Sequence, residues 1–384
     1  MKKIITILIV CFSIQTIFAQ QPFGRGKISV QQVAHNAVRI QYTEGNIQNN
    51  LPDWIYVKHE TLKSNDLKVT LDKKHQRLFI KNKSGKTVFT ATRHQFEGNG
   101  ATLTFQSPKD ECLFGLGQFQ DGYSNVRGLS RRLTQVNTQI SLPMLISSKG
   151  YGILWNNYGL TDFNPCHQSV KLQKQSGAGK QEVVNVTSTE GGRQEIRERH
   201  IFEASIDIAE SGDYALLLDV GQKMARRHNL CIDGQTVIEM QNLWLPPTAS
   251  KIVHLSKGLH KLTAELTRDD APTLYYNKVK DETTFHSPMA NAVDYTVFIG
   301  SADEIIASYR ELTGVCPQMP KWALGYIHCR ERFHSSQEIL ETANRFRKEN
   351  MPISLIVQDW QYWGKYGWNS MKFDEEFYPD PKAL

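Results

Sequence analysis

The sequence lacks several features that would place it in a common class of protein. It has no cysteine pair at metal-ligand spacing and no two histidines four residues apart. Its net charge of +6, from 45 Lys and Arg against 39 Asp and Glu, is spread along the chain. After residue 20, no run approaches the roughly 18 to 20 apolar residues that a membrane span needs. We therefore expect no metal, no cofactor, no nucleic-acid partner and no membrane span; the oligomeric state stays open.

The first twenty residues have the pattern of a secretory signal peptide. Lys2 and Lys3 provide a positive start, residues 4–12 are apolar, and Ala19 precedes a plausible cleavage site. A buried N-terminal helix is the alternative, but the order of these features favours a leader over residues 1–20. Lipid attachment at Cys11 is disfavoured because no small residue precedes it. We therefore expect a secreted or periplasmic protein.

The remaining cysteines show no disulfide framework. They are odd in number and widely spaced, which favours buried small apolar side chains, although a bridge between Cys112 and Cys166 stays open. The five are Cys112, Cys166, Cys231, Cys316 and Cys329.

Most of the chain has the pattern of antiparallel β structure. Val38, Ile40 and Tyr42 alternate with polar residues, and turn residues separate such runs up to about residue 181, which predicts a β-sandwich. A second β-rich stretch follows, and strand-like sequence returns at 292–299, as if the second unit were inserted in the first. The small residues 176–179 mark a long hairpin or a boundary. We predict a sandwich over 21–183, an inserted β domain over 184–285 and a return strand over 286–300.

After residue 300 the pattern changes to alternating helix and strand. Ser301 and Glu304 form a capping box, and Gly314 ends the predicted linker helix within 301–319. Strands are predicted at 322–327 and 352–357, with a helix between them that starts at a second capping box at Ser335. The segment 320–384 is thus predicted to be β-α-β.

This last segment carries the residues that suggest a ligand. Four of the seven tryptophans lie after position 320, and Asp359 with Trp360 follows directly after the second predicted strand. In a β/α barrel, ligands bind at the carboxyl ends of the strands. A carboxylate accepts hydrogen bonds from vicinal hydroxyls while indole rings cover the apolar face of a sugar. The alternative is that these rings fill a core beneath a loop. The acidic run Asp374, Glu375 and Glu376 is interpreted as a solvated loop.

Several motifs together resemble glycoside hydrolase family 31, in its α-xylosidase and α-glucosidase branch. The barrel motifs are the runs PKWALGY from Pro320, RERF from Arg330, IVQDWQYWG from Ile356 and MKFD from Met371. Upstream, FGLGQ from Phe114 and NVRG from Asn125 are similar to the family's N-terminal sandwich. FGLGQ lacks the helix and the Lys-Ser/Thr of a nucleotide-binding loop.

The resemblance implies a domain plan and a reaction. It implies a galactose mutarotase-like sandwich, an inserted protective-antigen-type (PA-14) domain and the first β-α-β of a (β/α)8 barrel. The motifs that resemble a PA-14 domain contain Asp233-Gly234 and the run from Ser256 to His260. Glycan binding by this domain is one interpretation, and a simple type I′ turn at Asp233-Gly234 is the other. The family's reaction is retaining hydrolysis of an α-linked terminal sugar by two Asp residues.

The resemblance also implies which residues touch the sugar. Asp359 would bind hydroxyls in the −1 subsite, and Trp360 and Trp363 would wall the pocket. Glu331 and Arg332 follow the first strand and are candidates for the same sugar, or for a structural ion pair at the barrel mouth. These are predicted substrate-binding residues; no catalytic residue is assigned within the chain, because both catalytic carboxylates lie on later strands.

The expected function is that of the N-terminal part of an α-xylosidase acting on xyloglucan-type oligosaccharides. The sequence stops at Leu384, far short of the roughly 250 residues of a full barrel, so the chain is expected to be truncated and inactive alone. An α-glucosidase of the same family and a non-catalytic carbohydrate-binding remnant are the alternatives. An open barrel start would expose the apolar strand at 353–357, which favours truncation.

Overall fold

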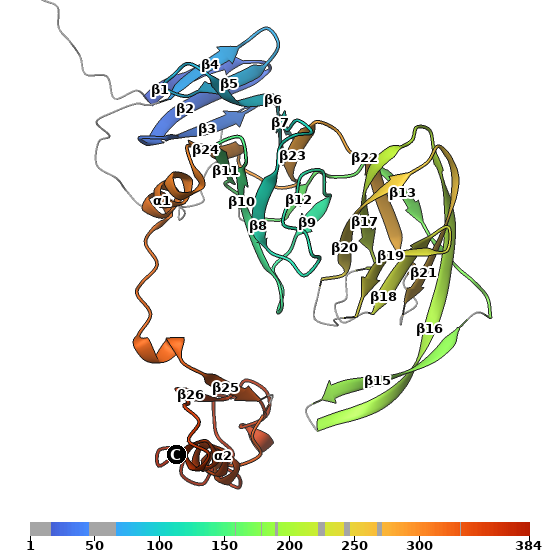
Figure 1. Ribbon diagram of the computed structural model, residues 1–384, viewed down its shortest axis with the longest axis vertical. Coiled ribbons are helices and arrows are strands. Elements are labelled where there is room, and N and C mark those ends of the chain that lie inside the picture. The colour runs from blue at the N-terminus through green and yellow to red at the C-terminus, as the bar shows by residue number, and fades with distance from the viewer. Residues whose placement is uncertain are drawn as a thin grey trace, which may run out of the picture. The chain divides into compact units, whose positions relative to one another are not determined.

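A computed structural model describes most of the chain, which is mostly β and ends in a short β-α-β segment (Figure 1). The predicted leader lies almost entirely outside the described residues, since β1 begins at Ile17. No helix in the described ranges is long and apolar enough to cross a bilayer. Contacts divide the chain into two units, Met1–Val183 with Ile196–Gly314, and Val184–Glu195 with Val315–Leu384. The described residues are 17–45, 67–157, 159–177, 179–188, 191–221, 227–241, 246–266, 271–330 and 332–384.

Two sheets of seven strands form a sandwich in the first unit. In the first sheet the order is β1 (Ile17–Phe23), β2 (Gly26–Ala34), β3 (Ala37–Thr43), β24 (Val293–Ile299), β11 (Tyr151–Trp155), β10 (Ile140–Ser147) and β8 (Leu113–Gln118). In the second the order is β4 (Lys68–Asp72), β5 (Arg77–Lys81), β6 (Thr87–Glu97), β7 (Gly100–Gln106), β23 (Glu282–Ser287), β12 (Thr161–Phe163) and β9 (Arg131–Leu133). The predicted alternation on β3 is confirmed, because Val38, Ile40 and Tyr42 are all buried.

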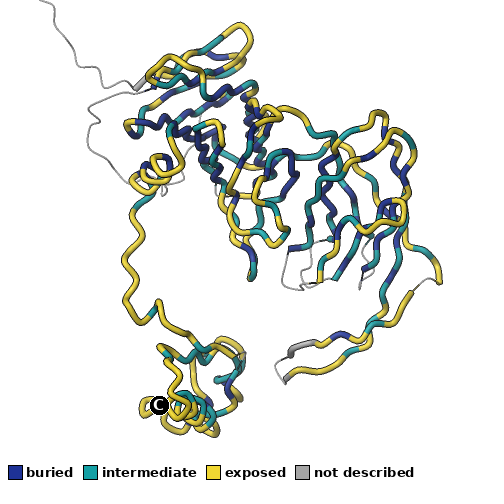
Figure 2. Tube along the Cα trace, viewed as in Figure 1, coloured by how far each residue is buried: buried dark blue, intermediate teal, exposed yellow. Residues whose placement is uncertain are grey.

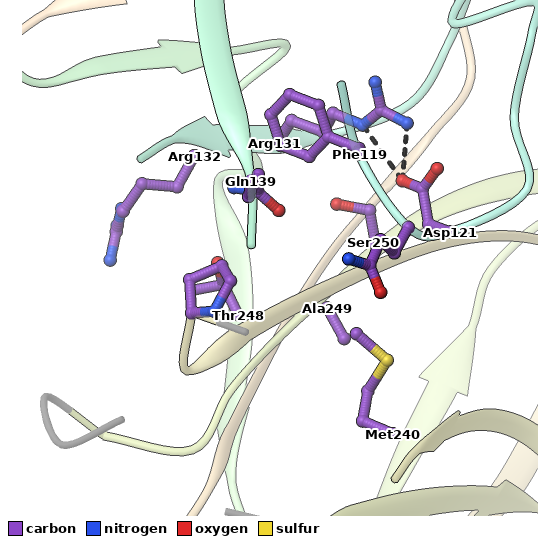
Figure 3. A pocket seen from close by; sticks show the side chains of 11 residues that line it. Phe119, Asp121, Arg131, Arg132, Gln139, Met240, Thr248, Ala249 and Ser250 are labelled. Carbon is purple, nitrogen blue, oxygen red and sulfur yellow. Dashed lines mark hydrogen bonds and ion pairs between the residues drawn. The ribbon is translucent and has the colours of Figure 1, made fainter. Parts of the chain in front are cut away.

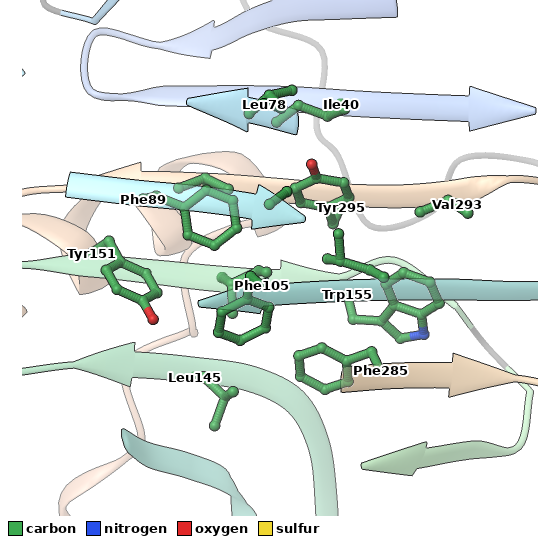
Figure 4. Close-up of a cluster of buried hydrophobic side chains, with 14 of the residues drawn as sticks. Ile40, Leu78, Phe89, Phe105, Leu145, Tyr151, Trp155, Phe285, Val293 and Tyr295 are labelled. Carbon is green, nitrogen blue, oxygen red and sulfur yellow. The ribbon is translucent and has the colours of Figure 1, made fainter. Parts of the chain in front are cut away.

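Aromatic rings from both sheets meet in the sandwich core (Figure 4). Phe285 stacks on Trp155 with ring centroids 5.8 Å apart and planes at 6°, and Phe105 stacks on Phe285 at 6.4 Å. The Trp155 indole N–H donates to Ser287 Oγ at 3.0 Å, so the buried ring also satisfies its polar atom. Since Phe285 lies on β23, residues from beyond the insertion complete the core.

The glycines of the FGLGQ run serve close strand packing. A Cβ on Gly115 would lie 2.3 Å from the carbonyl oxygen of Met144, and one on Gly117 would lie 2.2 Å from that of Ile140. Both residues have positive φ, 130° and 101°. Only glycine lets β8 lie this close to β10, so the run is explained structurally.

Helix α1 (Ala302–Thr313) covers the outer face of the first sheet. Its capping box at Ser301 and Glu304 and its end at Gly314 confirm the prediction. Ile305 and Leu312 are buried in a cluster with residues of that sheet, including Phe298. The helix therefore belongs with the sandwich.

Two further sheets occupy the region between β12 and β23. One has the order β13 (Gln168–Lys171), β22 (Thr273–Lys278), β17 (Gly212–Asp219) and β20 (Thr248–Leu255). The other has the order β14 (Gln173–Lys174), β16 (Gly191–Ile208), β21 (Gly258–Leu266), β18 (His228–Ile232) and β19 (Gln235–Met240), with β15 (Lys180–Ser188) paired to β16. Sheet membership changes at β13, before the predicted boundary at residue 184. β23 crosses the predicted boundary at residue 285 and pairs in the sandwich. Gly177 lies between β14 and β15, which both pair with β16.

A histidine ties together two neighbouring turns of these inserted sheets. Asp233 and Gly234 both have positive φ, 51° and 80°, as the type I′ turn between β18 and β19 requires. The Nδ1 of His260 lies 2.6 Å from the Asp233 carboxylate and its Nε2 lies 2.8 Å from the Ser256 carbonyl oxygen. Because both partners accept, the ring is held as the imidazolium, and these bonds raise the pKa of His260.

The first prediction concerns this histidine. Because its pKa is raised in the folded state, its contribution to stability is present below about pH 6.5 and is lost as the pH rises through the raised pKa. We expect His260→Gln to lower the thermal midpoint at pH 5.5, by the equivalent of about 1 kcal/mol since Asp233 is half exposed, and much less at pH 9. The exposed pair of His254 with Asp213 provides the control, His254→Gln, which should change little. An equal loss from His260→Gln at both pH values would contradict this.

The C-terminal segment of the second unit is a short β-α-β. Strands β25 (Ile327–Arg330) and β26 (Leu355–Gln358) pair in parallel, with α2 (Ser336–Lys348) between them along the chain. The predicted strand at 322–327 is wrong in most of its length: Lys321–Leu324 is a 3-10 helix after Pro320, closed by a hydrogen bond from Gly325 N to the Trp322 carbonyl oxygen. The predicted strand at 352–357 begins only at Leu355. Much of this segment is exposed (Figure 2).

The five cysteines in the described chain form no disulfide. The expectation that all five are buried is wrong, because Cys316 and Cys329 are exposed and the other three are only partly covered. Both exposed thiols lie in the C-terminal segment, where few side chains are fully buried.

The acidic run near the C-terminus is not entirely solvated, which corrects its interpretation as a solvated loop. Asp374 is 3% exposed, and its carboxylate accepts hydrogen bonds from the backbone N–H groups of Lys365 and Glu376 at 2.9 and 3.1 Å. These bonds lower the pKa of Asp374. Glu375 remains exposed, where Tyr366 and Lys365 lower its pKa to about 2. Asp374 thus fastens the loop after β26 through backbone donors, while the exposed Glu375 binds side chains of the same loop.

The second prediction tests this fastening. Asp374→Ala removes the acceptor for two backbone donors, so we expect several-fold faster amide hydrogen exchange at Lys365 and Glu376. Glu376→Ala, at an exposed position two residues away, is the matched control and should leave the rate at Lys365 unchanged. If Asp374→Ala does not accelerate amide exchange at Lys365, then Asp374 does not hold this loop.

Candidate functional site

The two parallel strands bring the predicted site residues to one edge. The register pairs Ile327 with Leu355 and Arg330 with Gln358, so both strands end at the same level. Asp359 follows β26 directly, and Arg332 lies two residues beyond β25. Carboxyl ends of parallel strands are where such sheets place ligand-binding residues. Glu331, the other predicted residue, lies outside the described residues.

Asp359 has the environment of a residue available to a ligand. Its side chain is exposed. Among the described residues, it takes part in no hydrogen bond or ion pair, whereas Asp374 nearby in sequence is occupied by backbone donors. A free carboxylate at a strand end can accept two hydrogen bonds from a ligand's hydroxyl groups. Asp359 therefore offers a hydrogen-bond acceptor at the end of β26.

Side-chain amides brace the two loops that leave the strands. Gln358 accepts from the backbone N–H of Phe333 at 3.1 Å and donates to the Trp360 carbonyl oxygen at 2.9 Å. Arg332 donates through Nη1 to Gln361 Oε1 at 2.6 Å. Arg332 therefore joins the loop after β25 to the loop after β26. Its partner there is an amide; the alternative of a structural ion pair with Glu331 falls on a residue outside the described ranges.

Three indole rings form one cluster after β26. Trp368 lies 5.7 Å from Trp360 and 5.6 Å from Trp363 between ring centroids. Trp363 is 8% exposed and supports the cluster, whereas Trp368 is 69% exposed. An exposed indole held by two others offers a rigid apolar surface beside Asp359 in sequence. Trp360 and Trp363 were predicted from the sequence; Trp368 was not, although its position in the same tryptophan-rich run was a usable signal.

The arrangement offers groups that can bind a polyol. It supplies one free carboxylate, one guanidinium that has spare donors, and an apolar ring surface. No group of three or more His, Cys, Asp or Glu in the described ranges is placed to hold a metal ion. The site therefore has the chemistry of a sugar-binding subsite.

Comparisons with known proteins agree with this chemistry. Residues 316–384 match the family model described as the glycosyl hydrolases family 31 TIM-barrel domain. An α-xylosidase of Saccharolobus solfataricus is 26% identical over 392 residues, which cover 94% of this chain and 38% of that protein. α-Glucosidase 2 of Bacillus thermoamyloliquefaciens is 34% identical over 113 residues, covering 29% of this chain and 14% of that protein.

Solved structures show the same fold. The family 31 α-xylosidase of Xanthomonas citri superposes with a TM-score of 0.75 at 21% identity, covering 96% of this chain and 47% of that one. The chain thus spans less than half the length of each of these proteins. Over nearly its whole length, it is similar to the N-terminal portion of family 31 glycoside hydrolases, α-xylosidases among them.

Proposed function

We propose that this chain is the N-terminal part of a retaining family 31 glycoside hydrolase that removes terminal α-xylose from xyloglucan-type oligosaccharides. The observation that carries the proposal is the free carboxylate of Asp359 at the end of β26, within a segment that matches the family's barrel model. The likeness to an α-xylosidase over 94% of the chain supports xylose as the sugar.

In this proposal Asp359 and the indole cluster hold the terminal sugar in the −1 subsite. Asp359 accepts hydrogen bonds from two neighbouring hydroxyls, and Trp360, Trp363 and Trp368 wall the apolar side. The bulk of these rings leaves no room for the hydroxymethyl group that distinguishes glucose from xylose. Arg332 keeps the two loops together through Gln361.

The bond-breaking carboxylates belong, in this proposal, to later strands of the barrel, beyond Leu384. One Asp attacks the anomeric carbon as the glycosidic C–O bond breaks, while a second Asp donates its proton to the leaving oxygen. Water then attacks the covalent intermediate and gives its proton to the second Asp, which releases the sugar with its configuration retained. Residues 1–384 alone therefore bind but do not hydrolyse.

Three finer assignments belong to the same proposal. The sandwich is of the galactose mutarotase type, the inserted sheets are a PA-14 domain, and the leader over residues 1–20 directs the protein to the periplasm or outside the cell. Support comes from the sequence motifs and, for the sandwich, from its two sheets around one core. α-Glucosidase activity is the second candidate, supported by the 34% identity to α-glucosidase 2 over 113 residues.

The third prediction tests Asp359. In the protein encoded by the complete reading frame, we expect Asp359→Asn to lower kcat/KM for xylose release by about 10²-fold or more, because a charged acceptor for two hydroxyls is weakened in the transition state. Asp303→Asn, at an exposed position in the first turn of α1, is the matched control. Unchanged kcat/KM in Asp359→Asn would show that this residue does not bind the sugar.

The fourth prediction separates the two sugars and the two lengths of chain. We expect the protein from the complete reading frame to hydrolyse p-nitrophenyl α-xyloside with a higher kcat/KM than the α-glucoside, and residues 21–384 to hydrolyse neither. A higher kcat/KM for the α-glucoside would reverse the proposed specificity. Hydrolysis by residues 21–384 alone would overturn the placement of the catalytic carboxylates on later strands.

A further inference from the structure

The sandwich and the inserted sheets meet along a seam in which one arginine contacts carboxylates of both. Arg132, on β9, donates through Nε to Asp162 Oδ1 at 3.1 Å and through Nη1 to Asp219 Oδ2 at 3.1 Å. Asp162 lies on β12 of the sandwich, whereas Asp219 lies on β17 of an inserted sheet. Because the guanidinium is a rigid planar fork, two such bonds fix the direction of one carboxylate relative to the other.

The outer edge of β20 is bound to the sandwich beside this arginine. The backbone N–H of Ile252 donates to the Tyr123 hydroxyl at 3.1 Å, and Ser250 Oγ donates to the Ser130 carbonyl oxygen at 2.5 Å. The ammonium of Lys251 lies 5.6 Å from the centre of the Tyr123 ring. In the described sheet order β20 is an edge strand, with β17 as its neighbour. The sandwich thus satisfies polar groups that an edge strand would otherwise expose.

Close packing extends this seam to the places where the chain crosses between the two parts. Gly128 has a φ of 78°, and a Cβ there would lie 2.7 Å from Val279 Cγ1, so no side chain fits between the sandwich loop and the returning chain. At the outgoing crossing, the Cys166 thiol lies 3.6 Å from the carbonyl oxygen of Ala215 on β17. Burial raises the pKa of Cys166 to about 11.

The pocket at the seam leaves little room for a ligand (Figure 3). Its volume of about 20 Å³ is enough for about one water molecule. The two arginines in its lining already have partners: Arg131 donates twice to Asp121, and Arg132 binds Asp162 and Asp219. Arg132 therefore joins the two parts, whereas the Arg131 pair lies within the sandwich.

We propose that the sandwich and the inserted sheets form one rigid body, with Arg132 as the positioning residue that fixes their relative orientation. The inserted unit is then a fixed extension of the sandwich and does not swing on its two crossings. This inference is independent of the proposed function, because it concerns residues outside the candidate sugar site.

Cys166 provides a direct reporter of seam opening. In a protein whose other cysteines are replaced by serine, the rate of thiol modification by a disulfide reagent at constant pH measures how often Cys166 becomes accessible. We expect slower modification than in the unfolded chain, because the thiol is partly covered and its pKa is raised. Arg132→Met, which keeps the length of the side chain and removes both ion pairs, should increase the rate by about tenfold. Arg77→Met, at an exposed position on β5, is the matched control and should leave it unchanged.

If Cys166 is modified at the same rate in Arg132→Met as in the protein that keeps Arg132, then Arg132 does not fix the orientation of the two parts. A second measurement keeps Arg132 and replaces all native cysteines, Cys166 included, by serine. Spin labels on Ser84→Cys and Lys257→Cys, in exposed turns of the sandwich and of the inserted sheets, then report the distance between the two parts. One narrow distance distribution is expected from a rigid body. A broad or two-peaked distribution, with circular dichroism unchanged by labelling, would overturn the proposal.

Discussion

The return of the chain after the insertion is the constraint on which the first unit depends. β23 pairs with β7 and β12, and β24 pairs with β3 and β11, so each sheet is joined across its middle by a strand that follows the inserted sheets. Phe285 on β23 then stacks between rings of the core. Both ends of the insertion are consequently anchored in a buried ring cluster. Pairing strands so distant in sequence carries a loop-closure cost that this core must offset.

Charged side chains serve opposite purposes at the seam and at the candidate sugar site. At the seam, the charges of Arg132, Asp162 and Asp219 satisfy one another, and the contact becomes structural. After β26, Asp374 likewise accepts hydrogen bonds from backbone donors. Asp359, next in sequence to the first of the three indole rings, is left exposed. A carboxylate without an internal partner is the one that a sugar hydroxyl can use. The pairing of charges thus separates the structural acids from the proposed ligand-binding acid.

Features that depend on a few neighbouring residues could be predicted from the sequence. The alternation on β3, the capping box at Ser301 and the turn at Asp233-Gly234 follow from local sterics and hydrogen bonds. The burial of Asp374 could not be predicted, because its donors come from a loop whose path is not encoded locally. The same holds for the seam, since Arg132 and Asp219 are 87 residues apart in the chain.

At the site, the sequence predicted Asp359, Trp360 and Trp363 from their position after a strand and from the family resemblance. Their roles in binding stay predictions, and Trp368 became a candidate only through its ring contacts. The most direct test is a crystal structure of the protein from the complete reading frame with xylose bound. We expect the Asp359 carboxylate to accept hydrogen bonds from two neighbouring sugar hydroxyls; a xylose bound without contact to Asp359 would contradict the proposed subsite.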